Sequence, residues 1–548
     1  MNRTWLNPWA LGTVIVGGAL LSPIIAVFAA ATGDGSGLWG HLFDTVLPRY
    51  IGNTLLLMLG VGFITLIYGI SSAWVIVRYN FPGRKVIEWC LLLPFAVPPY
   101  IAAYAYTDFF EYSGPLQGML REVFQWENAR SYWFPEIRSL PGAMLVMGSV
   151  LYPYVYVMSR VAFTLTPASL FEAGMLTQRN VFSRIGLPLA RPAIISGLAL
   201  VLMETISDFG TVEYFSIETL TLGIFNVWLG MNSLPTAAQI ASLSFVFIVL
   251  LLTIEMISRS RRKFTDTTRS TPPLKRIKLN KNSTYLCWFI CLVPIFLGFI
   301  IPAGILIDFA VDSFYLTTLG DIGSAAKNSL FISGASSIVV IVVASLLGFV
   351  TFYQKNSLLR KWIILASTGY AFPGTILAIG VVTIGGALDN GISSVLHESL
   401  GVSHHGWFTG GVGMVIFACV VRFQAIGYGA ITSGLERLPV NMLDASRVLG
   451  KSFSSSLYKI IFPLSRLSII SGALLVFVDT MKELPMALLL RPFNYETLAT
   501  FVYQYAKDEL IEEAAFPALI IIITSIIPVI IINYSLNRVS RNSYDIQG

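Results

Sequence analysis

Charge is scarce in this sequence of 548 residues: only 12% are Asp, Glu, Lys or Arg, whereas 55% are hydrophobic and the mean hydropathy is +0.72. Soluble domains carry about 25% charged residues, so a water-soluble protein of this length could not cover its surface. The apolar residues also fall into blocks of about 20, the length of a helix that crosses a bilayer. These features exclude a soluble enzyme, a disordered chain and a disulfide scaffold, and they predict an all-α polytopic membrane protein.

Cysteine is equally scarce, with four residues in the whole chain. All four lie in apolar runs without the spacing of metal ligands, so we expect them to be buried as small hydrophobic side chains. The first apolar run, Trp9 to Ala31, is longer than the apolar core of a signal peptide, which has about 7–15 residues. We therefore expect an uncleaved membrane helix there.

Twelve apolar blocks form two sets of six around a hydrophilic segment. The expected spans lie at 9–31, 54–77, 86–110, 143–164, 193–215, 238–257, 286–308, 329–353, 361–385, 411–432, 468–490 and 515–535. This pattern predicts about 12 transmembrane helices in three regions. They are a first transmembrane half at 1–258, a basic linker at 259–285 and a second transmembrane half at 286–548.

The linker explains the formal net charge of +6. Residues 259–281 hold nine Lys or Arg and one Asp, and without them the chain has 27 basic and 29 acidic residues. By the positive-inside rule this segment is cytoplasmic, and six spans on either side then place both termini in the cytoplasm. The basic charge therefore indicates topology and contact with the lipid bilayer, and it gives no indication of nucleic-acid binding.

The two halves are similar in sequence. Residues 188–197 (PLARPAIISG) match 463–472 (PLSRLSIISG), and the acidic pair at 204 and 208 matches the pair at 479 and 483. Both matched blocks begin a span after an expected cytoplasmic loop, so the repeats are parallel. Parallel six-helix halves predict a fused pair of transporter halves around a pseudo-two-fold axis along the membrane normal.

Two expected cytoplasmic loops, at 171–188 and 443–463, share an acidic residue, an alanine, a small residue and a later proline. They resemble the EAA loops of ATP-binding-cassette importer permeases, which implies the type I importer permease fold. In that family the loop forms a short coupling helix that docks on a cytoplasmic ATPase. The matching residues are Glu172, Ala173, Gly174, Asp444, Ala445, Ser446 and Gly450.

The first loop departs from that pattern. Gln178 stands where the glycine is expected and Pro188 arrives three residues early, which predicts a shorter coupling helix. In the second loop, Gly450-Lys451-Ser452 ends like a phosphate-binding loop, but Ala445 replaces the first glycine that such a loop requires. We therefore expect no ATP site, no cofactor and no enzymatic activity in this chain, with ATP used by a separate subunit.

Six blocks along the chain carry a closer resemblance, to the fused two-half permeases for ferric iron. They lie at 94–98, 103–108, 112–115, 208–215, 482–485 and 490–493. The resemblance implies import of Fe(III) across a bacterial inner membrane, with a periplasmic binding protein and two copies of a cytoplasmic ATPase as partners. Fused permeases for thiamine or phosphonate share the architecture, so such a small solute is an alternative cargo.

Acidic residues inside the spans are the candidate translocation path. Glu204 and Asp208 are four residues apart and share a helix face, and Asp479 and Glu483 repeat that spacing. Glu204 would lie about 16 Å from the cytoplasmic start of its span, near the middle of the membrane. A hard trivalent cation prefers oxygen ligands, to which Tyr214 and either Tyr104 or Tyr106 could contribute. We expect no permanent metal site, because transport requires release.

Two alternatives remain open for these acids. Lys482 could neutralise Asp479 or Glu483, and Arg422 could pair with another acid, which would make the acids static links between helices. The four acids could also carry protons in an ion-coupled secondary transporter, although such a protein would not need paired EAA-like loops. In the outer loops, Glu218, Glu496 and the acids at 508–513 are candidates for a rim on which the binding protein docks.

Overall fold

The computed structural model describes residues 8–35, 37–166, 168–176, 180–260, 276–313, 319–353, 357–400, 406, 408–436, 438 and 441–545. Helices dominate these residues, as the apolar blocks predict. A two-residue parallel pairing joins β1 (Tyr79–Asn80) to β2 (Ile277–Lys278). The predicted all-α polytopic fold is confirmed.

Elements from the first half and the linker follow the chain in this order: α1 (Pro8–Ala31), α2 (Leu38–Thr45), α3 (Leu47–Arg78), β1, α4 (Arg84–Cys90), η2 (Leu93–Ala96), α5 (Pro99–Phe110), α6 (Pro115–Phe124), α7 (Leu140–Leu165), α8 (Ala168–Leu176), η3 (Phe182–Gly186), α9 (Leu187–Ser207), α10 (Gly210–Tyr214), α11 (Leu220–Phe225), η4 (Asn226–Gly230), α12 (Leu234–Ser260) and β2.

The second half contains α13 (Lys281–Ile295), η5 (Phe296–Ile300), α14 (Ile301–Asp312), α15 (Leu319–Tyr353), α16 (Ser357–Ala366), η7 (Gly369–Ala371), α17 (Gly374–Leu400), α18 (Val412–Leu435), α19 (Asn441–Val448), α20 (Phe453–Ser456), η8 (Leu457–Ile461), α21 (Phe462–Met481), α22 (Pro485–Leu490), α23 (Leu498–Lys507) and α24 (Ile511–Asp545).

Ten helices in the described residues are long and apolar enough to cross a membrane, and an eleventh span is a pair bent by 93° between Arg84–Ala96 and Pro99–Phe124. The remaining predicted span, 238–257, lies on α12. Three predicted boundaries are wrong because the helices break. The span predicted at 361–385 is divided between α16 and α17 before Gly374, and those at 193–215 and 468–490 end at Ser207 and Met481. Pro373 accounts for the break before Gly374, since proline disfavours helix in the residue before it and Phe372 is extended with ψ 132°.

The chain forms two compact units whose composition differs from the predicted halves. Unit 1 comprises Met1–Gly40, Ile224–Phe245 and Thr318–Phe501, and unit 2 comprises His41–Gly223, Val246–Thr317 and Val502–Gly548. Each unit therefore takes its main helices from one half and its first membrane helix from the other. The halves at 1–258 and 286–548 stay a prediction about the sequence repeat.

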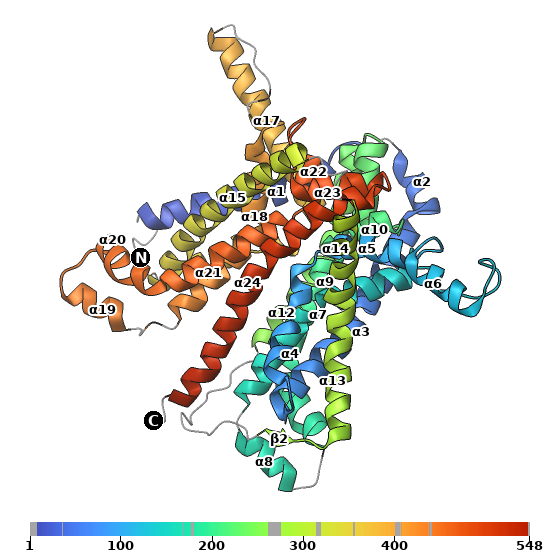
Figure 1. Ribbon diagram of the computed structural model, residues 1–548. Coiled ribbons are helices and arrows are strands. Elements are labelled where there is room, and N and C mark those ends of the chain that lie inside the picture. The colour runs from blue at the N-terminus through green and yellow to red at the C-terminus, as the bar shows by residue number, and fades with distance from the viewer. Residues whose placement is uncertain are drawn as a thin grey trace. The chain divides into compact units, whose positions relative to one another are not determined.

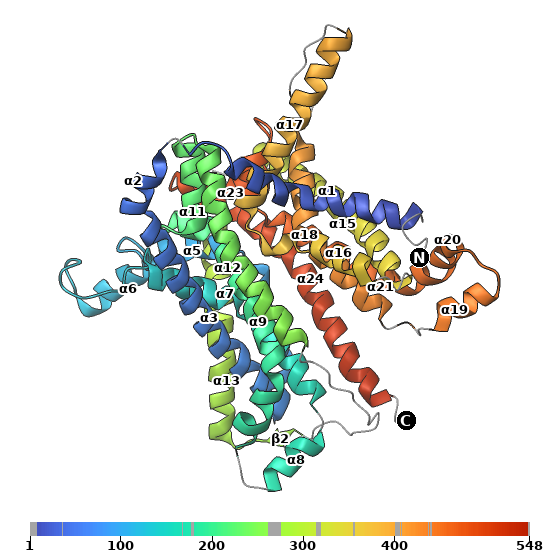
Figure 2. The same ribbon diagram turned by 180° about the vertical axis from the view of Figure 1, so that it is seen from behind.

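In unit 1, α1 packs against α16 and α17 of the second half, and the second view of the ribbon shows it beside α15 and α16 (Figure 2). Gly380 on α17 allows this approach, because a Cβ there would overlap with the backbone carbonyl oxygen of Pro23. The contact joins residues more than 350 positions apart in the chain, so local sequence patterns give no sign of it.

In unit 2, α3 and α7 run side by side, with α9 against both (Figure 1). Second-half elements join this group: α13 packs on α3, and α14 packs on α5 and α24. Two polar contacts anchor the exchanged segment. The Tyr106 hydroxyl donates to the Leu297 carbonyl oxygen, and the Trp288 indole N–H donates to the Pro82 carbonyl oxygen at 3.1 Å.

Matching hydrogen bonds reveal the repeat in three dimensions. The Asn53 amide on α3 donates to the Glu218 carbonyl at 3.0 Å, and Thr54 accepts from the Leu220 N–H at 3.0 Å. On α15, the Asn328 amide donates to the Glu496 carbonyl at 2.9 Å, and Ser329 accepts from the Leu498 N–H at 2.7 Å. Both halves therefore hold the segment after their short helix, α10 or α22, by the same pair of bonds.

The approach of α1 to α17 predicts that Gly380→Ala destabilises the protein. The added methyl group would push the helices apart, and overpacking of this kind costs about 1–3 kcal/mol. Thermal unfolding of the purified protein in micelles would show a lower midpoint. Gly386→Ala on the same helix, where a Cβ meets nothing within 4 Å, is the control that should not lower it. Equal midpoints for the two variants would contradict this packing.

Candidate coupling and translocation sites

The second predicted coupling segment is a helix closed by its glycine. Gly450 follows α19 in the left-handed region with φ +73°, where a Cβ would be strained. The Lys451 N–H bonds to the Ser446 carbonyl oxygen at 3.1 Å, and the Leu449 N–H bonds to the Ala445 carbonyl oxygen at 3.1 Å. The bond from Lys451 to Ser446 is the six-residue hydrogen bond of a Schellman cap, so Gly450 ends α19. The role of α19 as a coupling helix stays a prediction.

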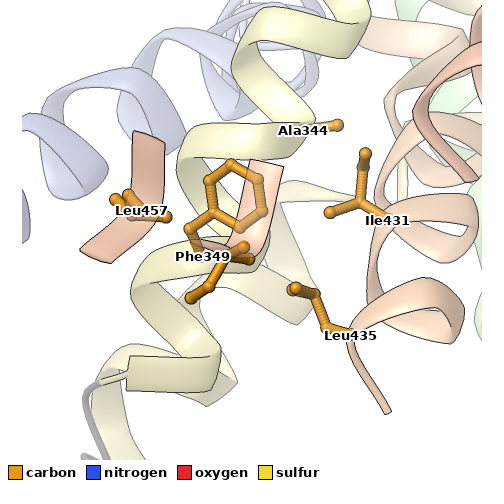
Figure 3. Close-up of a cluster of buried hydrophobic side chains, with 6 residues drawn as sticks. Ala344, Phe349, Ile431, Leu435 and Leu457 are labelled. Carbon is orange, nitrogen blue, oxygen red and sulfur yellow. The ribbon is translucent and has the colours of Figure 1, made fainter. Parts of the chain in front are cut away.

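A hydrophobic cluster holds the chain that returns from α19 to the membrane helices. Figure 3 shows Leu457 of η8 beside Phe349 of α15, with Ile431 and Leu435 of α18 opposite. The buried hydroxyls of Ser446 and Ser456 share a 2.7 Å hydrogen bond that links α19 to α20. These contacts connect α19 through α20 and η8 to α15 and α18.

The first coupling segment is held by aromatic rings. Trp74 of α3 contacts Phe163 of α7, Phe171 of α8 and Phe182 of η3, with ring centroids 5.3, 6.0 and 5.0 Å apart. Arg78 lies over the Phe171 ring at 5.9 Å. The two segments thus contact matching helices through different side chains.

The predicted coupling residues divide into exposed and buried positions. In the first segment, Glu172 is exposed and Gly174 is buried, and a Cβ at Gly174 would overlap with Ile185. In the second segment, Ala445 is exposed and Ser446 is buried. The side chains of Ala173 and Asp444 lie outside the described residues, although their backbones lie on α8 and α19. Among the described residues, α8 covers Ala168–Leu176 and α19 covers Asn441–Val448. Gln178 lies outside the described residues, so the shorter first coupling helix stays a prediction.

In the first half, Asp208 caps a helix. It follows the end of α9 and accepts hydrogen bonds from the Thr211 and Val212 N–H groups at 3.0 and 3.3 Å and from the Thr211 hydroxyl at 3.1 Å. These groups begin α10 and would otherwise be orphaned. Glu204 is half-buried one turn earlier on α9.

In the second half, Glu483 occupies the position that matches Asp208, and it pairs with the cation of Arg422. Its carboxylate accepts from the Met486 N–H at 3.3 Å at the start of α22 and from the Arg422 guanidinium at 3.2 Å. Asp479 pairs with Lys482 at 3.4 Å. These ion pairs match the alternative in which Lys482 and Arg422 neutralise the acids as static links between helices. A translocation path lined by all four acids stays a prediction.

Tyr214 lies in an aromatic cluster of unit 2. Its ring is 4.5 Å from that of Tyr104 and lies beneath the Arg138 guanidinium at 5.0 Å. Tyr106 is held by the Leu297 carbonyl, so Tyr104 is the closer of the two predicted partners. In the described part of the chain, no group of three His, Cys, Asp or Glu side chains could hold a metal ion.

Several acids of the predicted outer rim form ion pairs or hydrogen bonds. Glu218 pairs with Arg49 at 2.9 Å, Glu496 pairs with Arg491, and Glu512 accepts from the Ser313 hydroxyl at 2.7 Å. His397 is exposed on α17, and the loop residues at 404 and 405 lie outside the described residues.

The sequence did not predict two groups of ion-paired residues. Glu213 of α10 pairs with Lys507 of α23 at 3.0 Å, and their separation of 294 positions leaves no sequence signal. Glu88 of α4 accepts from Arg84 at 2.7 Å and from Arg160 of α7, and all three side chains are buried. The spacing of Arg84 and Glu88 by four residues was a usable helical signal.

Comparison with known proteins agrees with this architecture. Residues 341–542 match the family described as binding-protein-dependent transport system inner membrane component. The Fe(3+)-transport system permease protein FbpB 2 of Haemophilus influenzae is 22% identical over 536 residues, which cover 96% of this chain and 97% of that protein.

Two sulfate transport proteins match shorter regions. The sulfate transport system permease protein CysW of Escherichia coli is 32% identical over 216 residues, 38% of this chain and 69% of that protein. CysT of Salmonella typhimurium is 28% identical over 227 residues, 39% of this chain and 78% of that protein.

The membrane helices and these matches define the transmembrane permease subunit of an ATP-binding-cassette importer. The chain belongs to the family of binding-protein-dependent transport system inner membrane components. Membership implies that it works with a substrate-binding protein and an ATPase.

The environments of the two capping acids predict unequal effects on stability. Glu483→Gln would leave buried Arg422 without its carboxylate, and breaking a buried pair costs about 3–5 kcal/mol. Asp208→Asn should cost less than about 1 kcal/mol, because asparagine is itself a good N-cap. Unfolding midpoints in micelles would measure both. Adding Arg422→Met to Glu483→Gln should recover part of the loss, and equal losses for the two single variants would contradict the assignment.

Proposed function

We propose that this chain is the permease of a ferric-iron importer, which receives Fe(III) from a periplasmic binding protein and releases it into the cytoplasm. One observation carries the choice of cargo. The similarity to the Fe(3+)-transport permease FbpB 2 extends over nearly the full length of both chains, including the linker and both halves.

The charges of the candidate path support a cationic cargo. In unit 1, Arg422 and Lys482 are each paired with a carboxylate, which leaves neither cation available to an anion. In unit 2, Glu204 and Asp208 add two acids near the end of α9. Carboxylate oxygen is a suitable ligand for a hard trivalent cation.

Sulfate is the second candidate cargo, because CysW is more similar in percentage terms, at 32% identity. That match spans 216 residues, fewer than either half of the chain. Such a region reflects the machinery that importer permeases share. An oxyanion would also need unpaired N–H donors or cations in the path, and the paired state of Arg422 and Lys482 argues against it.

The coupling helices suggest how ATP drives the cycle. Two copies of a cytoplasmic ATPase would bind α8 and α19, with Glu172 and Asp444 at the contacts and the basic linker and both termini on the same side. Closure of the ATPases on ATP would pull both helices. The clusters around Trp74 and Leu457 would pass that motion to the membrane helices, opening them to the binding protein.

Resetting of the cycle would follow ATP hydrolysis on the partner. The permease itself would bind no cofactor, hold no permanent metal ion and contact the lipid bilayer of the inner membrane. Its carboxylates would bind the cargo only in passing, because tight binding would prevent release.

Reversing the charge of the second coupling helix tests the ATPase contact. We expect Asp444→Lys to reduce the ATPase that copurifies with the permease by at least ten-fold, because a matched charge contact becomes repulsive. Glu122→Lys, the same charge change at an exposed position on α6, should retain it. Full ATPase recovery with Asp444→Lys would refute this docking role.

Cargo is tested by uptake of radioactive Fe(III) and, separately, of radioactive sulfate in cells with the binding protein and the ATPase. We expect ATP-dependent iron uptake and no sulfate uptake. Sulfate uptake without iron uptake would overturn the cargo. Iron uptake that persists without the ATPase but collapses with a protonophore would favour the ion-coupled alternative.

A further inference from the structure

A group of phenols and one carboxylate lies beside the end of α9 in unit 2. We call it the phenol cluster: Tyr104 of α5, Glu213 and Tyr214 of α10, and Tyr503 and Lys507 of α23. The Tyr104 and Tyr214 rings are 4.5 Å apart, and Glu213 is close enough to Tyr104 and Tyr503 to act on them electrostatically. Tyr104 of α5 therefore lies against α10, and Lys507 of α23 contacts both Glu213 and Tyr503.

Two of these phenols are unusual for buried tyrosines. Tyr104 is 2% exposed and Tyr214 is 9% exposed, and the hydroxyl groups of both have no hydrogen-bond partner in the described part of the protein. Buried polar groups are nearly always satisfied. Tyr106 on the same helix and Tyr152 on α7 follow that rule, and they donate to the carbonyl oxygens of Leu297 and Leu91.

A lysine neutralises the carboxylate of the cluster. The Lys507 ammonium lies 3.0 Å from Glu213 and 3.4 Å from the Tyr503 hydroxyl, and 57% of the Lys507 side chain is exposed. Glu213 itself is largely covered, at 17%. The lysine therefore reaches in from solvent and can withdraw without breaking the core.

The second half lacks this chemistry. If the repeat is matched through Pro98 with Pro373 and through Asp208 with Glu483, then Ile379, Leu488 and Leu489 occupy the positions of Tyr104, Glu213 and Tyr214. The scaffold does not require polar groups at these positions, since the matching half uses apolar ones. The phenols and the acid serve something other than the fold.

The geometry points to a transient binding site for a hard trivalent cation in the phenol cluster, with Tyr104, Tyr214 and Glu213 as oxygen ligands and Lys507 as a cation that holds Glu213 until the cargo arrives. This inference rests on the proposed import of ferric iron and names where that cargo first binds this chain. Phenolate and carboxylate oxygens are hard donors that suit such an ion.

The binding step balances without a redox partner. Each phenol that ligates Fe(III) replaces a water or citrate oxygen on the incoming ion and loses its O–H proton to water as the Fe–O bond forms. The Lys507 ammonium leaves Glu213 still protonated, and the Glu213 carboxylate replaces another such oxygen. The iron remains Fe(III). Release reverses these steps, with protons returning to the phenols.

Iron bound to phenolate absorbs visible light by charge transfer, which gives a direct readout. The purified permease in micelles, titrated with ferric citrate, should develop this band. Tyr104→Phe with Tyr214→Phe should abolish it, and Glu213→Gln should weaken iron binding at least ten-fold. Tyr106→Phe is the matched control, a buried phenol on the same helix that already has a partner, and it should leave the band unchanged.

A variant that binds iron more tightly than the wild type distinguishes the loss of a ligand from misfolding. Lys507→Gln removes the competing ammonium and should strengthen iron binding several-fold, which a disrupted fold would not do. A band that is absent from the wild type, or that survives in the Tyr104→Phe/Tyr214→Phe variant, would overturn the site.

The uptake assay separates this inference from the proposed function. If wild-type cells take up iron and the double tyrosine variant does so at the same rate, the site is wrong while the cargo stands. If wild-type cells take up no iron, the cargo itself is wrong.

Discussion

A helix that stops inside a bilayer exposes backbone N–H groups to hydrocarbon, and the need to satisfy those groups shapes the core of both halves. Two membrane helices, α9 and α21, stop short and are followed by the short helices α10 and α22. Asp208 and Glu483 supply the missing acceptors at the two restarts. A carboxylate is stable at these positions because the backbone dipoles at a helix N-terminus stabilise negative charge.

This constraint changes what the acidic pairs mean. A carboxylate that accepts two N–H bonds and a hydroxyl, as Asp208 does, or an N–H bond and a guanidinium, as Glu483 does, has little capacity left for a metal ion. Stripping it of those partners would also weaken the helix break that it stabilises. Side chains that do not accept backbone hydrogen bonds are therefore better candidates for binding the cargo. The phenols of Tyr104 and Tyr214 are such side chains.

Sequence patterns predicted the features that depend on local order. Apolar length gave the membrane helices, and the glycine at 450 gave the end of α19. The helix face predicted to be shared by the acids at 204 and 208 is wrong, because α9 ends at Ser207 and Asp208 has extended backbone with ψ 133°. The helix breaks after Ser207 and Met481 were missed, although Asp208 and Lys482 interrupt the apolar blocks there. The exchange of α1 and the pairing of Glu213 with Lys507 were beyond reach, since they depend on tertiary contacts between residues hundreds of positions apart.

Fusion of two halves in one chain lets matching positions diverge independently, which identical subunits cannot do because one substitution appears in both. The duplicated features are those that hold backbone: Asn53 with Asn328, Thr54 with Ser329, and the left-handed residues Ser216 and Asn494. The diverged features are charges and phenols. Arg422 joins the cap in one half, whereas the described cap contacts of Asp208 are to Thr211 and Val212. Divergence at these groups is expected if one side of the shared frame specialises in contacting the cargo.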